Sequence, residues 1–253
     1  MPRRYKRPCI EEAICEFTFV PSPLMPDIDL TLPGHLQAKL GKDLYPGPTR
    51  QVVNRTHLID PQGLQITDQL FRVQLHSKGE RSIVSIGRDV LSVSRIRPYD
   101  GWDNFKPEIQ RVLAAWPEVV STPRKCSRVG LRYINRLVTP PGKTIEHWLN
   151  AVSPPLAAKA EDGTAVNGTL RAINNRREFL TDHGYKVIVT LATLEPEVAT
   201  NNEYLIDIDA LVENAALDDH TKIIAMVENL HTITGAVFES LITDNTRAVL
   251  DAN

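Results

Sequence analysis

Residues 128–137 read RVGLRYINRL, and this stretch decides the fold that we expect for the chain. Apolar residues stand at alternate positions, and Arg128, Arg132 and Arg136 stand among the residues between them. Because successive side chains of a strand point to opposite faces of its sheet, the pattern predicts a strand with one buried face. The apolar face needs a covering layer, so the arginines belong to the opposite, polar face.

The residues before this strand predict a small antiparallel sheet between two helices. An alternating strand covers residues 13–19, a short helix follows near 35–42, and turn residues separate several further strands. A helix with an apolar stripe then runs from Trp102 to Trp116, and Pro117 is expected to end it. The further strands are expected at 50–59, from 64 to about 76, at 82–86 and at 90–96.

The residues after 120 repeat the same order of elements. The arginine-bearing strand is followed by a short helix at 144–151, a surface loop from Ser153 to Gly168 and three strands. The chain is expected to close on its longest helix, which begins near Asp218 or Asp219, acids that suit a helix N-terminus. We therefore expect an α+β protein in which a strand, helix, antiparallel sheet and helix unit is pseudo-duplicated, with halves 1–120 and 121–253 and helices covering one sheet face. The three strands are expected near 169–180, 186–194 and 204–210.

The composition fits a globular protein with a core of its own. The chain has 253 residues, 42% of them hydrophobic, and 29 basic against 31 acidic residues give a net charge of -2. This balance argues against a surface that is basic throughout, as an electrostatic trap for nucleic acid would be. Three widely spaced cysteines without a CxxC pair predict neither a disulfide framework nor a thiolate zinc site. A reducing, cytoplasmic location is therefore expected.

The basic opening of the chain, residues 1–7, runs into Pro8 and an alternating strand, unlike a secretory signal. We expect a solvated arm there, and contact with phosphate or acidic lipid is the alternative. No segment approaches the run of about 20 apolar residues that a membrane helix needs. We therefore expect no membrane contact through a spanning helix.

Several blocks of the sequence, taken together, resemble a known family. The blocks are PCIEEA at 8–13 followed by EF at 16–17, YDGWDNF at 99–105, RVGLRYINR at 128–136, IDID at 206–209, and LH at 230–231 through FESLITD at 238–244. They are similar to blocks of the TIGR04255 family, which comprises sporadically distributed prokaryotic proteins without an assigned function. Cys9 stands where a second proline or another small residue is expected. The resemblance implies a bacterial cytoplasmic protein of the kind seen in host-defence and toxin–antitoxin systems, and it supplies no catalytic residue.

The doubled order of elements also resembles the TATA-binding-protein fold class, in which a strand, a helix, four strands and a helix occur twice. The triphosphate-tunnel enzymes duplicate a related unit, and in them polar strand faces line a channel. Both likenesses concern the fold, and neither implies a function by itself. Whether the polar sheet face is open or curled into a tunnel is left to the structure.

The arginine row is the main candidate for binding. Guanidinium groups on one face suit phosphate or carboxylate recognition, but Arg128 and Arg136 lie about 26 Å apart on a straight strand. Only a long ligand or a partner surface would therefore contact the whole row. The alternative is a set of cross-strand salt bridges with acids such as Glu12, Glu16 and Asp207. The candidate binding residues are Arg128, Arg132, Arg136, Glu12 and Glu16.

The acidic residues are weak candidates for a metal site. Glu12 and Glu16 lie roughly 13 Å apart on their strand, too far to share one ion. Asp207 and Asp209 have the two-residue spacing of many magnesium sites, and an exposed strand face explains them equally well. We expect neither a bound metal nor a cofactor.

Other chemically notable residues have structural explanations. His231 lies at the edge of the last helix's apolar stripe and is expected to pack there. Alternation places Cys15 inward, and helical spacing places Trp102 and Phe105 in the core, with base stacking as the alternative. The sequence contains no P-loop, GxGxxG, GxSxG or HExxH motif.

Three functions stand as hypotheses. The first is a non-enzymatic module that engages a protein partner through the polar sheet face or the loop 153–168, in a defence or toxin–antitoxin setting; a homo-oligomer is compatible with it. The second is nucleic-acid or nucleotide binding on the arginine-bearing face, with help from Arg72 and Lys186, which the near-neutral charge disfavours. The third is a metal-dependent phosphohydrolase with Asp207 and Asp209 at the ion.

Overall fold

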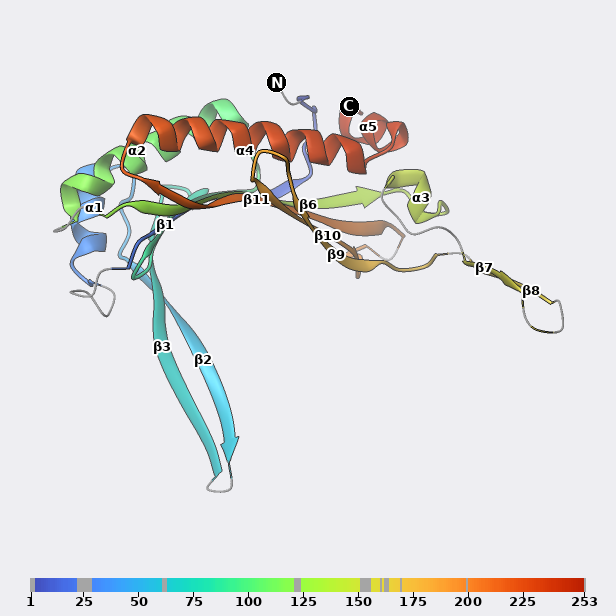
Figure 1. Ribbon diagram of the computed structural model, residues 1–253, viewed down its shortest axis with the longest axis horizontal. Helices are drawn as coiled ribbons and strands as arrows, with labels where there is room; N and C mark the ends of the chain where they lie inside the picture. The colour runs from blue at the N-terminus through green and yellow to red at the C-terminus, as the bar shows by residue number, and fades with distance from the viewer. Residues whose placement is uncertain are drawn as a thin grey trace. The chain divides into compact units, whose positions relative to one another are not determined.

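The structure is a computed structural model that describes residues 3–21, 29–60, 63–120, 124–150, 156–159, 161, 164–168, 170–198 and 200–252 (Figure 1). The helices are α1 (Leu32–Leu40), α2 (Trp102–Val119), α3 (Ile145–Trp148), α4 (His220–Leu241) and α5 (Asp244–Asp251). The strands are β1 (Ile10–Phe19), β2 (Arg50–Asp60), β3 (Gly63–His76), β4 (Ser82–Ile86), β5 (Val90–Ile96), β6 (Cys126–Thr139), β7 (Leu156–Lys159), β8 (Ala165–Gly168), β9 (Asn174–Leu180), β10 (Lys186–Leu194) and β11 (Asn202–Leu217). The expected mixture of helices and antiparallel strands is confirmed. None of the described helices has a stretch long and apolar enough to cross a membrane.

Nine of the strands form one antiparallel sheet in the order β2-β3-β4-β5-β1-β6-β11-β10-β9. The strands β7 and β8 pair only with each other. The two strands with the clearest alternation in the sequence, β1 and β6, are neighbours in the middle of this order. Short turns connect β4 to β5 and β9 to β10, and both pairs are antiparallel hairpins.

The chain forms two compact units, and each unit is built from separate parts of the sequence. Unit 1 contains residues 1–12, 132–211 and 228–253, and unit 2 contains residues 13–131 and 212–227. Strands β1, β6 and β11 and helix α4 each contribute residues to both units. The expected halves 1–120 and 121–253 remain a prediction.

In unit 2, α2 packs against α1 and β5, and α1 also contacts β3. Phe17 of β1 and Phe105 of α2 are fully buried, and the ring of Phe19 stacks on Trp116 with 5.5 Å between the centroids. The inward face expected for β1 and the apolar stripe expected for α2 are therefore present. Trp102, expected in the core, is only half-buried at the first turn of α2.

In unit 1, α4 lies along one face of β6, β11 and β10 (Figure 1). Tyr133 of β6 is buried, and its hydroxyl lies 3.1 Å from Nδ1 of His231 on α4. His231 is half-buried, so the expectation that it packs at the edge of the stripe is confirmed. Other buried residues of this sheet face include Leu137 of β6, Tyr204, Ile206, Ile208 and Ala210 of β11, and Val187, Val189 and Leu191 of β10.

Helix α2 is longer than expected, because Pro117 does not end it. The helix continues to Val119, and it also contains Pro107. A proline removes one intrahelical hydrogen bond, and near a C-terminus that loss affects only the last turn. Leu113 and Trp116, the last stripe residues before Pro117, are buried and hold this turn in place.

The expected surface loop from Ser153 to Gly168 contains the paired strands β7 and β8. Pairing of backbone groups needs no apolar alternation, so the sequence carried little sign of this hairpin. The helix expected at 144–151 is the single turn α3, because the next residue, Leu149, forms a β-bridge with Ile242. Residues 151–155 lie outside the described residues.

Side-chain caps mark the start of α4 and the start of the helix that follows it. At its start Asp219 caps α4 as expected, since its Oδ1 accepts the N–H of Thr221 at 2.8 Å. The chain does not close on this helix, however. The Thr243 hydroxyl accepts the N–H of Thr246 and starts a further helix, α5. This N-cap signal lay within the segment that we expected to be the end of one helix.

Four of residues 3–7 are exposed, as expected for a solvated N-terminal arm, but the arm also contacts the C-terminal helices. Arg3 forms an ion pair with Asp251 at 2.5 Å, and the Tyr5 hydroxyl donates to Glu239 at 2.6 Å. The Tyr5 ring also meets Phe238 edge-on, with 6.3 Å between the centroids. The basic residues of the arm suggested solvent, but Tyr5 supplies an aromatic ring and a donor that bind it to α4.

Candidate functional site

The strand β6 presents its arginines as the alternation predicts. Val129 and Leu131 are fully buried on one face, and Arg128, Arg132 and Arg136 belong to the other face. In each unit, the open face is the sheet face opposite the buried residues. On the open face of unit 1 lie Glu12, Arg132, Ile134, Arg136, Arg176, Glu178, Lys186, Ile188, Thr190, Ala192, Glu203, Leu205, Asp207 and Asp209.

Arg132 is held by a two-pronged ion pair with Asp207 of β11. Its Nε and one terminal nitrogen donate to the two carboxylate oxygens at 2.8 and 2.6 Å. The hydrogen bond with Asp207 raises the pKa of Arg132, and the charges of Asp209 and Glu12 add to the effect. Asp207 is nearly buried, whereas 44% of the Arg132 side chain is exposed. The structure thus contains the salt bridge that the sequence offered as the alternative to ligand binding.

Arg136 is held by two carboxylates. Its Nε donates to Oε2 of Glu203 on β11 at 2.6 Å, and another nitrogen donates to Glu197 at 2.6 Å. Glu203 is buried, and its second oxygen accepts the N–H of Glu197 at 3.0 Å. Hydrogen bonds to Glu197 and Glu203 raise the pKa of Arg136. The sequence interpretation named neither partner, because Glu197 lies outside the expected strands and Glu203 just before one.

In unit 2, Arg128 shares a carboxylate with Arg72 of β3. One oxygen of Glu16 accepts from Arg128 at 2.8 Å, and the other accepts from Arg72 at 2.8 Å. Arg72 also donates to the Ser92 hydroxyl at 3.2 Å, and its guanidinium lies 4.8 Å from the centre of the Phe71 ring. Each of these three charged side chains is at most one-quarter exposed. Glu16 therefore joins strands β3 and β6 across β1.

The five candidate residues do not form one site. Glu16 and Arg128 lie in unit 2, whereas Glu12, Arg132 and Arg136 lie in unit 1. Glu12 acts on Arg132 through its negative charge. Each unit therefore has its own charged open face.

The acids on the open face of unit 1 do not form a metal centre. Asp207 already accepts two hydrogen bonds from Arg132, which leaves Asp209 as the other carboxylate of the predicted pair. Among the residues that the structure describes, no three His, Cys, Asp or Glu side chains come together as metal ligands would. The phosphohydrolase hypothesis gains no support from this arrangement.

The cysteines are buried or half-buried and lack the features of nucleophiles. Burial raises the pKa of Cys126 to about 11 and that of Cys9 to about 12, and it raises the pKa of Cys15 as well. A thiol with such a pKa holds almost no thiolate at neutral pH. The expected inward position of Cys15 is confirmed, since it is fully buried.

The sequence interpretation missed a buried carboxylate in unit 2. Glu108 of α2 accepts from the Tyr45 hydroxyl at 2.7 Å, from Ser82 at 2.9 Å and from Arg95 at 2.5 Å. Arg95 also pairs with Asp100 at 3.1 Å. Glu108 thus ties α2 to β4, β5 and the segment after α1. Its only sign in the sequence was a charged residue next to Ile109, one of the apolar stripe residues.

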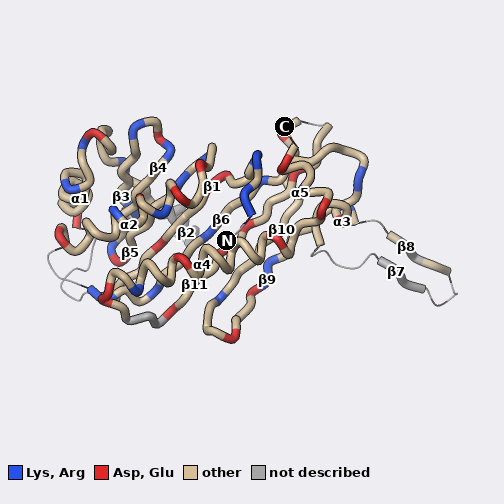
Figure 2. Tube along the Cα trace, turned by 90° about the horizontal axis from the view of Figure 1, so that it is seen from above, with Lys and Arg blue, Asp and Glu red and all other residues tan. Residues whose placement is uncertain are grey.

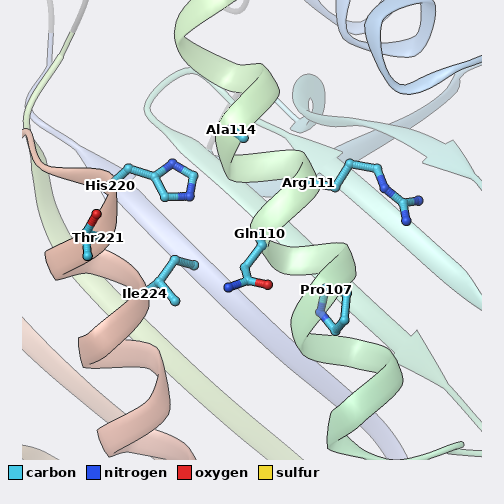
Figure 3. A pocket seen from close by; sticks show the side chains of 7 residues that line it. All are labelled: Pro107, Gln110, Arg111, Ala114, His220, Thr221 and Ile224. Atoms are coloured by element: carbon cyan, nitrogen blue, oxygen red, sulfur yellow. The ribbon is translucent and has the colours of Figure 1, made fainter.

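A shallow groove of about 450 Å³ lies between α2 and the first turns of α4 in unit 2. Figure 3 shows His220 and Ile224 directed from α4 toward α2, Gln110 directed toward α4, and Arg111 directed away from it. The groove is largely open to solvent, unlike the enclosed pockets that bind most small molecules. Its remaining lining residues are Pro107, Ala114 and Thr221.

Basic and acidic residues are interspersed over the molecule (Figure 2), and strand β6, whose charged residues are all basic, lies next to β11, whose charged residues are all acidic. This distribution agrees with the paired charges described above. Searches of known protein-family models and of curated proteins find no match for this sequence. The resemblance to the TIGR04255 family therefore remains a prediction, and the evidence for function comes from the site itself.

Proposed function

We propose that the chain is a non-enzymatic binding module, and that the open face of unit 1 binds a protein partner. The observation that supports this proposal is a strip of apolar residues on this face that lies between two ion pairs. The ion pairs are Arg132–Asp207 and Arg136–Glu203. The defence or toxin–antitoxin setting implied by the family resemblance is part of the proposal.

The strip consists of Ile134, Leu205 and Ala192. Ile134 stands between Arg132 and Arg136 on β6, and Leu205 pairs with Ala192 across β11 and β10. All three strip residues are half-buried. An apolar centre within a polar rim is the usual anatomy of a protein–protein interface. Because the rim charges are already paired, a partner can cover them without leaving a buried charge unmatched.

The charge balance of this face favours a protein over a nucleic acid. Its described residues include five acids against four bases. Binding to a phosphate backbone depends on an excess of positive charge, which releases counterions from the nucleic acid. The acids are Glu12, Glu178, Glu203, Asp207 and Asp209, and the bases are Arg132, Arg136, Arg176 and Lys186.

The proposal is tested by capture from the native host and then by purified components. The bait is the intact chain, compared with Ile134→Lys and with the matched control Val198→Lys, an exposed apolar residue outside the strip. We expect the captured partner to bind the wild type and the Val198 variant, and to lose at least tenfold in affinity with Ile134→Lys. Equal affinity for all three baits would contradict the proposal.

Nucleic-acid binding is the alternative function, and the variant Arg132→Ala tests it. Binding of labelled single- and double-stranded DNA and RNA at low salt would be measured by fluorescence anisotropy for the wild type and Arg132→Ala. A tight, salt-dependent complex that requires Arg132 would replace the protein-partner proposal with the nucleic-acid one.

We further infer that the two halves of the chain are a pseudo-duplication with halves like those of the TATA-binding-protein fold class. Two features support this. The order of elements from β1 to α2 resembles that from β6 to α4. In both halves of the sheet the first strand lies next to the last one, and the earlier strands follow outward, as β1-β5-β4-β3-β2 and as β6-β11-β10-β9. An experimental structure in which residues 10–119 superpose on residues 126–241 tests this inference.

A further inference from the structure

The strand β9 is the last strand of the nine-stranded sheet and presents its outer edge. In the described part of the chain, β10 is the neighbour of β9 in the sheet, and no strand follows on its other side. At the opposite end of the order, β3 stands equally far from the middle strands but carries β2 on its outer side. An exposed strand edge is a template for pairing with another strand.

The register identifies which backbone groups of β9 point outward. Thr193 donates its N–H to the carbonyl of Ile173, and Thr181 donates to the carbonyl of Tyr185, both at 2.8 Å. Hydrogen-bonded pairs alternate along an antiparallel ladder. The odd-numbered residues of β9 therefore bond to β10, and the even-numbered residues direct their N–H and C=O groups away from the sheet. These are Asn174, Arg176, Glu178 and Leu180, and all four are exposed.

We infer that this edge pairs with β9 of a second copy of the chain, antiparallel and centred on Arg177. In this register Arg176 lies opposite the partner's Glu178, and Glu178 lies opposite the partner's Arg176. Shifting the register by two residues either way places Arg176 opposite itself or Glu178 opposite itself. Opposite charges in cross-strand pairs stabilise a sheet and like charges destabilise it, so the charges select the register centred on Arg177.

The other face of β9 supplies a second observation. In the same register the partner's Arg177 lies diagonally next to Phe179, whose side chain is 48% exposed. A long side chain reaches diagonal neighbours in a sheet. The partner's guanidinium can therefore cover the Phe179 ring, and this contact offsets the repulsion between the two central arginines.

Sedimentation-velocity ultracentrifugation of the full chain over a concentration series tests the inference. We expect a monomer–dimer equilibrium for the wild type. Arg176→Glu and Glu178→Arg should each be monomeric alone, because each places like charges opposite one another. Mixed in equal amounts, the two variants should form a heterodimer, because both cross-strand pairs are then complementary again. Arg171→Glu, an exposed charge reversal just before β9, is the matched control and should dimerise as the wild type does.

A backbone variant removes the outward N–H without relying on charge. Arg176→Pro blocks pairing on the outer edge and leaves the β9–β10 hydrogen bonds in place, since edge strands tolerate proline on the solvent side. Circular dichroism and thermal melting confirm that each variant is folded. A wild type that sediments as a monomer at every concentration overturns the inference, as does a dimer that persists in Arg176→Pro or a mixture that stays monomeric. The result does not depend on the proposed partner face, because Ile134→Lys should remain dimeric.

Discussion

Replacing Glu108 by alanine should destabilise unit 2 severely. The carboxylate accepts hydrogen bonds from Tyr45, Ser82 and Arg95 and is almost fully buried. Hydrogen bonds to a charged group contribute about 1.5–3 kcal/mol each, and the contributions of groups in one network do not add. The expected loss is therefore taken from the roughly 3–5 kcal/mol lost when one member of a buried ion pair is removed. We therefore expect Glu108→Ala to lower the free energy of unfolding by about 3–5 kcal/mol.

Urea denaturation followed by tryptophan fluorescence measures this loss, because Trp102 and Trp116 lie on the same helix as Glu108. Tyr45→Phe is the matched control, since it removes one hydrogen bond to the carboxylate and should lower the free energy of unfolding by about 1.5–3 kcal/mol. A double-mutant cycle with Arg95→Met isolates the ionic contribution, and its coupling energy should exceed 1 kcal/mol, roughly. A Glu108→Ala protein that unfolds within about 0.5 kcal/mol of the wild type would refute the reasoning.

Phe105→Ala should lower the free energy of unfolding by about 3–5 kcal/mol, whereas Trp102→Ala should lower it clearly less because the Trp102 ring is half-buried. Thermal melting of both variants checks this, and equal decreases in melting temperature would show that the two rings are buried alike. Deleting residues 1–7 should lower the melting temperature by about 2–6 °C, since the arm contributes a hydrogen bond and an aromatic contact to α4, and an unchanged melting temperature would mean that the arm is solvated. Burial raises the pKa of Cys126 from 9.0 to about 11. Its thiol ionises first in the unfolded chain, so its contribution to stability is complete below pH 9 and is lost as the pH rises to about 11. The urea midpoint should fall less steeply between pH 8 and 11 for Cys126→Ala than for the wild type. The same dependence on pH in both proteins would show that ionisation of Cys126 does not contribute to the loss of stability.

The parts of the fold that follow from the spacing of apolar residues along the chain were predicted from the sequence. Strands β4, β5 and β10 have the expected bounds, because alternation and turn residues act locally. The polar face of β6 was likewise predicted, and Asp207 was one of the acids named in the alternative that its arginines form cross-strand salt bridges. These features depend on which face of a strand a residue occupies, and that is fixed by counting positions.

The parts that depend on long-range contacts were not predicted. Glu108 lies 63 residues from Tyr45, and nothing near it in the sequence marks the hydroxyl and guanidinium groups that surround it. Tyr5 contacts a helix that lies 234 residues away in the sequence. Pro117 was expected to end α2 by a local rule, but the buried stripe residues before it outweigh the loss of one hydrogen bond. In each case the deciding partner comes from a distant segment, which for α2 is Phe19, whose ring stacks on Trp116.

The arginine row has a different meaning in the structure from the one that its pattern first suggested. An arginine that binds phosphate needs guanidinium N–H groups that are available to the ligand. Arg132 instead donates two of them to Asp207, and Arg136 donates to Glu203 and Glu197. Breaking such a pair to bind a ligand would leave a nearly buried carboxylate without its cation, and that cost opposes exchange. In the proposed complex, the binding energy on this face would therefore come from the apolar strip around Ile134, while the arginines would exclude partners whose charges do not fit.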